Sequence, residues 1–335
     1  MLEGSSSGGL YPEVLYSIGY DSLTSSVCEI KDASIEMDHP FKSLRYLVRL
    51  MGSCNGLVCI RLVVDNDNGD EKNYFYLWNP ATREYKEIPK SPIKIDRIQM
   101  SALGYDHNTD DYKLVIGTVE PPGSKGTLVQ VYSLASNSWK PGQTVAYWFP
   151  SHYLEKHKHG VLVNGYFHWL VIAEHKFSLL SLGISDESFK ELHLLPKELL
   201  EKNKQRCMSL GVLEGCLCLC LLVTSDVDVP MFEVWQMLDY GVQESWARRF
   251  IIPLNSIMEN CLIFLSPLWS FENGEILLMS SSNLVLYDPE HGSARKLSKP
   301  SNSTCLTVNY IDSLVSLESG TYVGGEGRME ELRET

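Results

Sequence analysis

The sequence predicts an all-β fold of the β-propeller type, and three observations support this prediction. Five stretches repeat one pattern: short apolar strands, a turn rich in Asn, Asp and Gly, and often a Trp or Tyr near the end. The repeats recur at a spacing of about fifty residues, which is typical of radial or stacked arrays. Asn-Gly and Glu-Gly pairs stand between apolar runs, where hairpin turns form. The five repeats occupy residues 56–89, 102–139, 160–194, 208–252 and 268–297.

The first two repeats show where their strands begin and end. In the first, the aromatic segment 74–78 must stop at Asn79-Pro80, because proline cannot donate a hydrogen bond to a strand ladder. In the second, the polar cluster 106–111 separates two apolar runs and therefore predicts a turn.

The later repeats are marked by hairpin signals. Asn164-Gly165 predicts a two-residue turn, because both of its positions need a positive φ. Glu214-Gly215 and Asn273-Gly274 are similar signals in the fourth and fifth repeats. One short helix is expected at residues 196–204, where two leucines stand among charged residues.

A propeller must also close into a ring, because each blade has two apolar faces that it cannot bury alone. We expect closure through a strand at residues 308–317 that shares a blade with residues 11–51, which gives about six blades. A two-sheet sandwich is the alternative, and it explains the repeat less well. The predicted domains are a disordered linker at 1–9, the propeller at 10–318 and a disordered acidic tail at 319–335.

The composition and net charge limit the classes of partner that the chain is expected to bind. The 335 residues carry a formal charge of −13, with no dense basic run, which argues against nucleic acid and anionic membranes as partners. The longest apolar run, residues 216–223, is too short to cross a bilayer. Nine cysteines, an odd number, and no secretory segment favour a reducing compartment. We therefore expect a cytoplasmic or nuclear protein.

Metal and catalytic motifs are weak throughout. The nine cysteines form no C-x-x-C pair, and Cys216, Cys218 and Cys220 alternate along one predicted strand as small buried thiols would. Residues 65–71 resemble a calcium loop, but the glycine stands fifth rather than sixth. A solvated hairpin loop is the better interpretation.

The histidines and possible nucleophiles also give no pattern typical of a metal site or a catalytic site. His152, His157 and His159 could bind zinc, but no fourth ligand is evident, so surface histidines are expected. His168 is expected to be packed with a local hydrogen bond. Cys54 stands between two glycines, where a strand-entry turn is more plausible than a catalytic thiol. The sequence has no phosphate-binding loop of the G-x-x-x-x-G-K type. We predict no catalytic residue, metal or cofactor.

Aromatic residues divide into two groups. Trp78, Trp139, Trp169, Trp235 and Trp246 recur at equivalent repeat positions, which favours packing between blades. Other aromatics do not repeat, and they lie next to Pro150 in a connection between repeats. Irregular loops with aromatic side chains commonly anchor interfaces. The predicted partner-binding residues are Tyr147, Trp148, Phe149 and Tyr153.

The ordered series of motifs resembles the plant F-box associated interaction domain, the family that includes the S-locus F-box proteins. The resemblance covers roughly residues 10 to 318. The matching segments are 54–59 (CNGLVC), 78–83 (WNPATR) with 88–89, 104–106 with 110–115, 131–134 with 138–140, 164–165 with 168–170, 232–235 with 240–242 and 244–246, 284–289, and 310–317.

The resemblance implies a kelch-related propeller that captures a target protein for an SCF-type cullin–RING ubiquitin ligase. In such proteins an N-terminal F-box binds a Skp-type adaptor. Residues 1–50 show no Leu-Pro start and no apolar helical stretch, so the adaptor and cullin are expected partners only if an F-box lies outside this chain. The alternatives are a propeller-scaffold enzyme, such as a glycoside hydrolase or oxidase, and an adaptor-free binding module or decoy.

Overall fold

A computed structural model describes most of the chain, and all statements below refer to the residues that it describes. These are residues 2–5, 14–24, 34–42, 47–65, 71–95, 98–119, 126–147, 149, 159–173, 176–192, 195, 208–223, 230–253, 265–280, 283–297 and 306–317. The chain divides into two compact units, which are treated separately. Unit 1 comprises Met1–Cys28, Asp32–Val145 and Ser301–Thr335, and unit 2 comprises Glu29–Lys31 and Ala146–Pro300.

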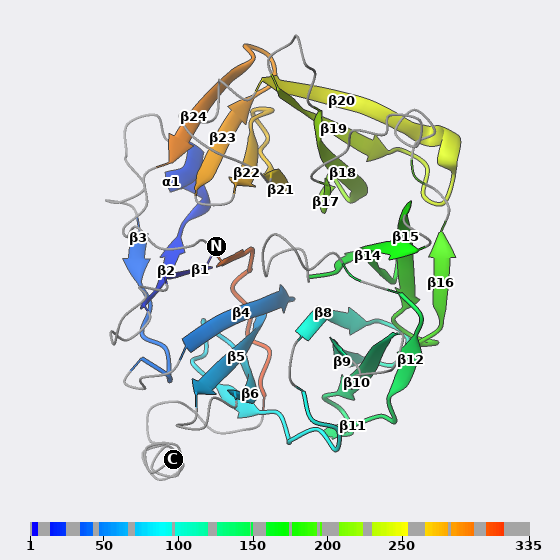
Figure 1. The fold of residues 1–335 in the computed structure, drawn as a ribbon. Helices are drawn as coiled ribbons and strands as arrows, with labels where there is room; N and C mark the ends of the chain where they lie inside the picture. The colour runs from blue at the N-terminus through cyan, green and yellow to red at the C-terminus, as the bar shows by residue number, and fades with distance from the viewer. Residues whose placement is uncertain are drawn as a thin grey trace. The chain divides into compact units, whose positions relative to one another are not determined.

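Unit 1 contains two antiparallel sheets that each use one continuous stretch of chain (Figure 1). The first sheet has β4 (Leu47–Cys54), β5 (Leu57–Asp65), β6 (Glu71–Trp78) and β7 (Tyr85–Glu87) in sequence order. The second has β8 (Ile98–Asp106), β9 (Asp111–Val119), β10 (Thr127–Ser133) and β11 (Ser138–Trp139), and β12 (Gln143–Val145) also pairs with β10.

Unit 2 contains three more sheets of four consecutive strands. They are β13 (Val161–Val163), β14 (Tyr166–Ala173), β15 (Lys176–Gly183) and β16 (Phe189–Leu192); β17 (Met208–Leu213), β18 (Cys216–Val223), β19 (Met231–Met237) and β20 (Trp246–Pro253); and β21 (Leu265–Ser270), β22 (Ile276–Ser280), β23 (Leu284–Asp288) and β24 (Ser293–Leu297). A 3-10 turn, η2 (Gln243–Ser245), precedes β20.

The remaining sheet, in unit 1, joins both ends of the chain. Its order is β25 (Leu306–Val308), β1 (Leu2–Ser5), β2 (Val14–Ile18) and β3 (Ser34–Glu36). The sequence prediction placed the C-terminal strand at 308–317 and no strand within residues 1–9. The C-terminal strand that forms is β25, which begins two residues before the predicted strand, ends at Val308 and pairs with β1. Helix α1 (Tyr20–Thr24) follows β2, and no helix in the described part of the chain is long and apolar enough to span a membrane.

Turn chemistry explains the hairpins. Asn164 and Gly165 have φ of 50° and 77°, and Glu214 and Gly215 have 51° and 75°, which confirms both predicted two-residue turns. In the third predicted turn only Gly274 has a positive φ, and the turn between β21 and β22 is correspondingly longer. The predicted helix at 196–204 lies outside the described residues, as does the tail at 319–335.

The core is built between neighbouring sheets, because the central strands are buried on both faces. On β18, Cys218 and Cys220 belong to a cluster shared with β22 and β23, whereas Leu217 and Leu219 belong to a cluster with β14 and β15. Strand β5 of unit 1 likewise divides its residues between two clusters. A sheet with two apolar faces must have a neighbour on each side, which is the packing that a propeller blade requires.

Residues 309–317 are not a strand, in contrast to the sequence prediction. Side chains hold this segment against the β4–β7 sheet instead. Asn79 Nδ2 donates to the carbonyl oxygens of Ser313 and Val315 at 2.9 and 2.7 Å. The Leu317 N–H donates to Glu84 Oε2 at 2.8 Å, and the Leu317 side chain is buried in the core.

Candidate interaction surface

The aromatic segment predicted to bind a partner contributes to packing in unit 2. Phe149 is only 4% exposed, and its ring stands edge-on to Trp169 with centroids 6.5 Å apart. The Tyr147 hydroxyl donates to Glu191 Oε2 at 2.7 Å, and burial together with this bond raises the pKa of Tyr147 to about 12. Trp148 and Tyr153 lie outside the described residues. Partner contact by this segment stays a prediction.

The recurring tryptophans pack within the sheets, as predicted. Trp78, Trp169, Trp235 and Trp246 are buried. Trp139 is half-buried against the core of unit 1, and its Nε1 donates to the carbonyl oxygen of Pro89 at 2.6 Å. The tryptophans stand on different strands of their sheets: Trp78 and Trp235 on the third, Trp139 and Trp246 on the fourth, and Trp169 on the second. A recurring Trp is a packing signal here, although its strand is not the same in every repeat.

Several cysteines in the described part of the chain have the properties of structural thiols. Burial raises the pKa of Cys54 to about 11 and that of Cys218 to about 12. Cys220 is also buried, and its pKa is raised for the same reason. A thiol is a poor nucleophile unless it ionises, so these residues stay protonated and unreactive at neutral pH.

His168 is fully buried, which confirms that it is packed. Its Nε2 lies 2.9 Å from the hydroxyl of Tyr240, which is 72 residues further along the chain. Burial lowers the pKa of His168 to about 4, which keeps the ring neutral. Of the loop histidines, His152 and His157 lie outside the described residues. In the part of the chain that is described, no three His, Cys, Asp or Glu side chains gather as metal ligands would.

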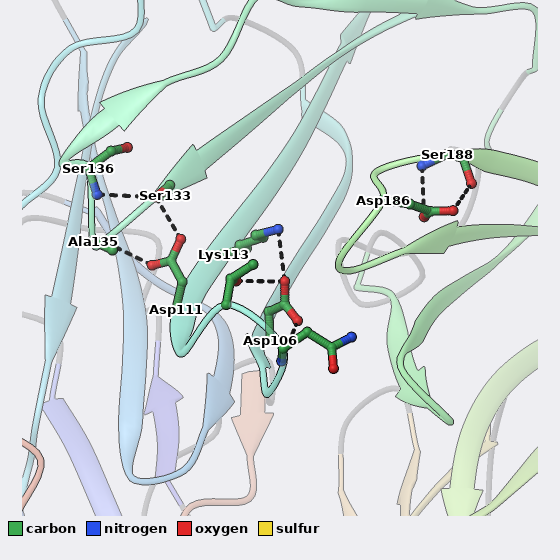
Figure 2. A network of polar contacts seen from close by, with 10 residues as sticks. Asp106, Asp111, Lys113, Ser133, Ala135, Ser136, Asp186 and Ser188 are labelled. Carbon is green, nitrogen blue, oxygen red and sulfur yellow. Dashed lines mark hydrogen bonds and ion pairs between the residues drawn. The ribbon is translucent and has the colours of Figure 1, made fainter.

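Carboxylates where β8 ends and β9 begins are occupied by hydrogen bonds and an ion pair (Figure 2). Asp106 accepts hydrogen bonds from the Asn108 N–H at 3.0 Å and the Thr109 hydroxyl at 2.7 Å, and it forms an ion pair with Lys113 at 3.1 Å. Asp111 accepts from the Ser133 hydroxyl at 2.6 Å and the Ala135 N–H at 2.8 Å. These acids stabilise turns, as the side chains of Asn and Asp do in many loops.

A groove in unit 1 combines an apolar floor with a basic rim. It encloses about 280 Å³ between β6 and the connection that follows β7. Phe75, Ile88 and Ile95 are buried in its floor, whereas Lys72, Lys90 and Lys94 are exposed at its rim. The Lys90 ammonium lies 5.5 Å from the centroid of the Tyr74 ring, close enough for a cation–π contact.

Side-chain bonds from three strands fix the connection that forms one wall of this groove. Besides the Trp139–Pro89 bond, Asn73 Nδ2 of β6 donates to the carbonyl oxygen of Ile95 at 2.7 Å. The Ser91 hydroxyl donates to Gln130 of β10 and accepts from the Ile93 N–H at 3.0 Å. The groove is therefore a fixed feature of unit 1.

A larger groove in unit 2 has the opposite charge. It encloses about 550 Å³ and is lined by turns and strand ends of the β17–β20 and β21–β24 sheets. Its charged residues are Glu214, Glu272, Asp288 and Glu290 against a single Arg249. The closest Arg249–Glu214 approach is 3.9 Å, and Asp288 is bound to His291 at 2.7 Å.

The comparison with protein families decides which family this chain represents. The model of the F-box associated beta propeller domain matches residues 13–317. The chain belongs to this family. The F-box associated propeller domain therefore accounts for both units, and the all-β propeller prediction is confirmed.

Relatives of the domain are plant F-box proteins. F-box protein CPR1 of Arabidopsis thaliana is 28% identical over 299 residues, covering 82% of this chain and 67% of the relative. F-box protein At4g22390 of the same plant is 30% identical over 274 residues, covering 71% and 63%. The chain thus spans about two thirds of the length of the curated relatives that it matches.

Solved structures show the fold at much lower identity. A chain in the crystal structure of a nidogen/laminin complex has a TM-score of 0.51 at 8% identity, covering 93% of this chain and 98% of that one. TolB from Acinetobacter baumannii has a TM-score of 0.52 at 8% identity, covering 90% and 64%. At this identity the likeness concerns the fold alone.

Neither groove of the propeller domain is predicted by the sequence. The signal for the basic groove was present, because Lys90 and Lys94 stand four residues apart in a Pro-containing connection of an acidic chain. The signal was too short to count as a basic run. Only the structure brings Lys72 of β6 to the same rim.

Proposed function

We propose that this chain is the substrate-recognition module of an SCF-type cullin–RING ubiquitin ligase. The carrying observation is the family match over residues 13–317. It is supported by relatives that are themselves called F-box proteins. In this proposal the domain captures a target protein and holds it where its lysines can receive ubiquitin.

The proposal assigns positioning, and no bond-making step, to the chain itself. Protonated thiols and turn-bound carboxylates support this assignment over the alternative of a propeller-scaffold enzyme. Cys54 and Cys218 have a raised pKa, and Asp106 and Asp111 are engaged in hairpins. An enzyme would need convergent groups that are free to act on a substrate.

Ligase assembly and cellular location belong to the same proposal. A Skp-type adaptor and a cullin are partners if an F-box is present outside this chain, and the site of action is the cytoplasm, the nucleus or both. We also propose that the domain has six blades, closed into a ring by the pairing of β25 with β1.

Targeted ubiquitination tests the proposed function. The tagged chain, fused to an F-box where the natural protein does not supply one, is expressed in plant cells beside the unfused chain. We expect one defined protein to bind both forms, and to be ubiquitinated and shortened in half-life only with the fused form. Turnover of a small molecule by the purified chain, with no protein whose ubiquitination depends on it, would contradict the proposal.

A further inference from the structure

We propose that the lysine-rimmed groove of unit 1, lined by β6 and residues 88–95, binds an acidic segment of the captured protein. In the bound state, carboxylates of that segment meet Lys72, Lys90 and Lys94, and one apolar side chain enters the groove. The inference rests on the proposed function of protein capture and names the chemistry of the segment that is held.

The charge of the groove contrasts with that of the chain. The protein has a formal charge of −13, whereas the charged residues lining this groove are three lysines and Glu87, a formal charge of +2. An acidic segment is repelled by most of such a surface and attracted at this place. Complementary charge of this kind selects partners and orientation more than it adds raw affinity.

The size and floor of the groove define the rest of the ligand. Its volume of about 280 Å³ is just below the range of about 300–1,000 Å³ that drug-sized ligands occupy. Phe75, Ile88 and Ile95 form an apolar floor, and the Tyr74 ring lies beside Lys90. This suits one large apolar side chain flanked by carboxylates.

The groove is also preorganised for binding. Three hydrogen bonds hold both walls in place before any ligand arrives. They join Trp139 to Pro89 at 2.6 Å, Asn73 to Ile95 at 2.7 Å and Ile88 to Phe75 at 2.8 Å. A fixed groove avoids the cost of ordering the protein's side of the interface, although the bound peptide still loses its own conformational freedom.

A labelled peptide tests the inference on the whole chain. The probe is a fluorescent heptapeptide with a central phenylalanine and two glutamates on each side, and its neutral control carries glutamine in place of each glutamate. The variants are the charge reversal Lys90→Glu with Lys94→Glu and the milder Lys90→Gln with Lys94→Gln. Lys190→Glu is the matched control, because Lys190 is an exposed lysine 5.3 Å from the Tyr166 ring but lies in unit 2.

We expect the acidic peptide to bind the natural protein and the Lys190 variant equally. Charge reversal at both rim lysines should weaken binding by about tenfold or more, and the glutamine pair by a smaller factor. Binding should also weaken as salt rises from 50 to 500 mM, because exposed charges are screened. The milder pair keeps the test valid if charge reversal disturbs folding.

Several results would overturn the inference. These are no binding of the acidic peptide, equal binding of the neutral peptide, equal loss with the Lys190 variant, or tighter binding of an oligothymidylate of the same charge. Target capture is measured on the same variants. If capture persists when the rim lysines are changed, the groove assignment fails and the proposed function stands; if the peptide binds but no target is captured, the proposed function fails alone.

Discussion

Lys113 and Lys90 lie in the same unit, but their surroundings are opposite. The Lys113 side chain is 5% exposed, and its ammonium lies 3.1 Å from an Asp106 carboxylate that is 1% exposed. Lys90 is exposed at the rim of a groove, beside a tyrosine ring. A buried charge must have its partner within the fold, whereas an exposed one can serve a partner from outside. Burial, rather than residue type, therefore separates the lysines that hold this domain together from those available for binding.

The largest effect should come from breaking the buried pair. Asp106→Ala leaves the Lys113 charge buried without its carboxylate and removes the acceptor for Asn108 and Thr109. Loss of one partner of a buried pair costs about 3–5 kcal/mol of unfolding free energy. Urea unfolding measures it.

Asp186→Ala is the matched control for that experiment. Asp186 is an exposed turn carboxylate that accepts two hydrogen bonds from Ser188 (Figure 2). Its loss should cost only about 0.5–1.5 kcal/mol. An equal loss of unfolding free energy in the two aspartate variants would contradict the distinction between buried and exposed carboxylates.

A pH titration extends the comparison to a buried neutral base. The pKa of His168 is about 4 in the fold and 6.5 in the unfolded chain, so the unfolded state binds a proton that the folded state excludes. Stability should therefore fall as pH drops from about 6.5 towards 4, by at most about 3 kcal/mol from this residue. His168→Gln should flatten this part of the stability curve. An unchanged pH dependence in the variant would show that His168 does not titrate as its burial requires.

Alanine substitutions at two separate glycines, Gly56 and Gly165, test how residues 309–317 pack against the β4–β7 sheet. Gly56 has a φ of +87°, and a Cβ there would lie 2.2 Å from the Ser313 Cβ. Gly165 has a φ of +77° with nothing within 4 Å of such a Cβ. Both Gly→Ala variants carry the backbone strain of about 1–3 kcal/mol, and only Gly56→Ala adds the clash. Adding Ser313→Gly should recover part of the extra loss. Thermal unfolding of the two variants would contradict this account if they were equally stable.

Local chemistry made the hairpins predictable from sequence. Asn164-Gly165 favours a positive φ at both turn positions, whereas in Glu214-Gly215 only the glycine does, and no long-range contact is needed for these predictions. Residues 309–317 were mistaken for a strand because their apolar residues suit an extended chain, but Asn79 and Glu84 bind this segment through side chains. Residues 2–5 gained a strand through pairing with a segment about three hundred residues away.

The candidate site was less predictable than the fold, for a related reason. Phe149 in an irregular connection has the composition of an interface anchor, but its burial against Trp169 depends on a contact that no local pattern encodes. The basic groove depends on tertiary packing that brings Lys72 of β6 and Lys94 of the connection after β7 to the lining of one groove. Sequence gives the residue types, and tertiary packing decides which of them face solvent.

The distinction between buried structural lysines and exposed binding lysines can be tested directly on two variants, Lys113→Gln and the pair Lys90→Gln with Lys94→Gln. For each variant, the unfolding free energy and the affinity for the acidic peptide are measured on the same sample. The account predicts that the Lys113 variant loses stability, while the rim pair changes stability by no more than about 0.5 kcal/mol and loses peptide affinity. A destabilised rim pair with unchanged affinity, or a Lys113 variant of natural stability, would contradict it.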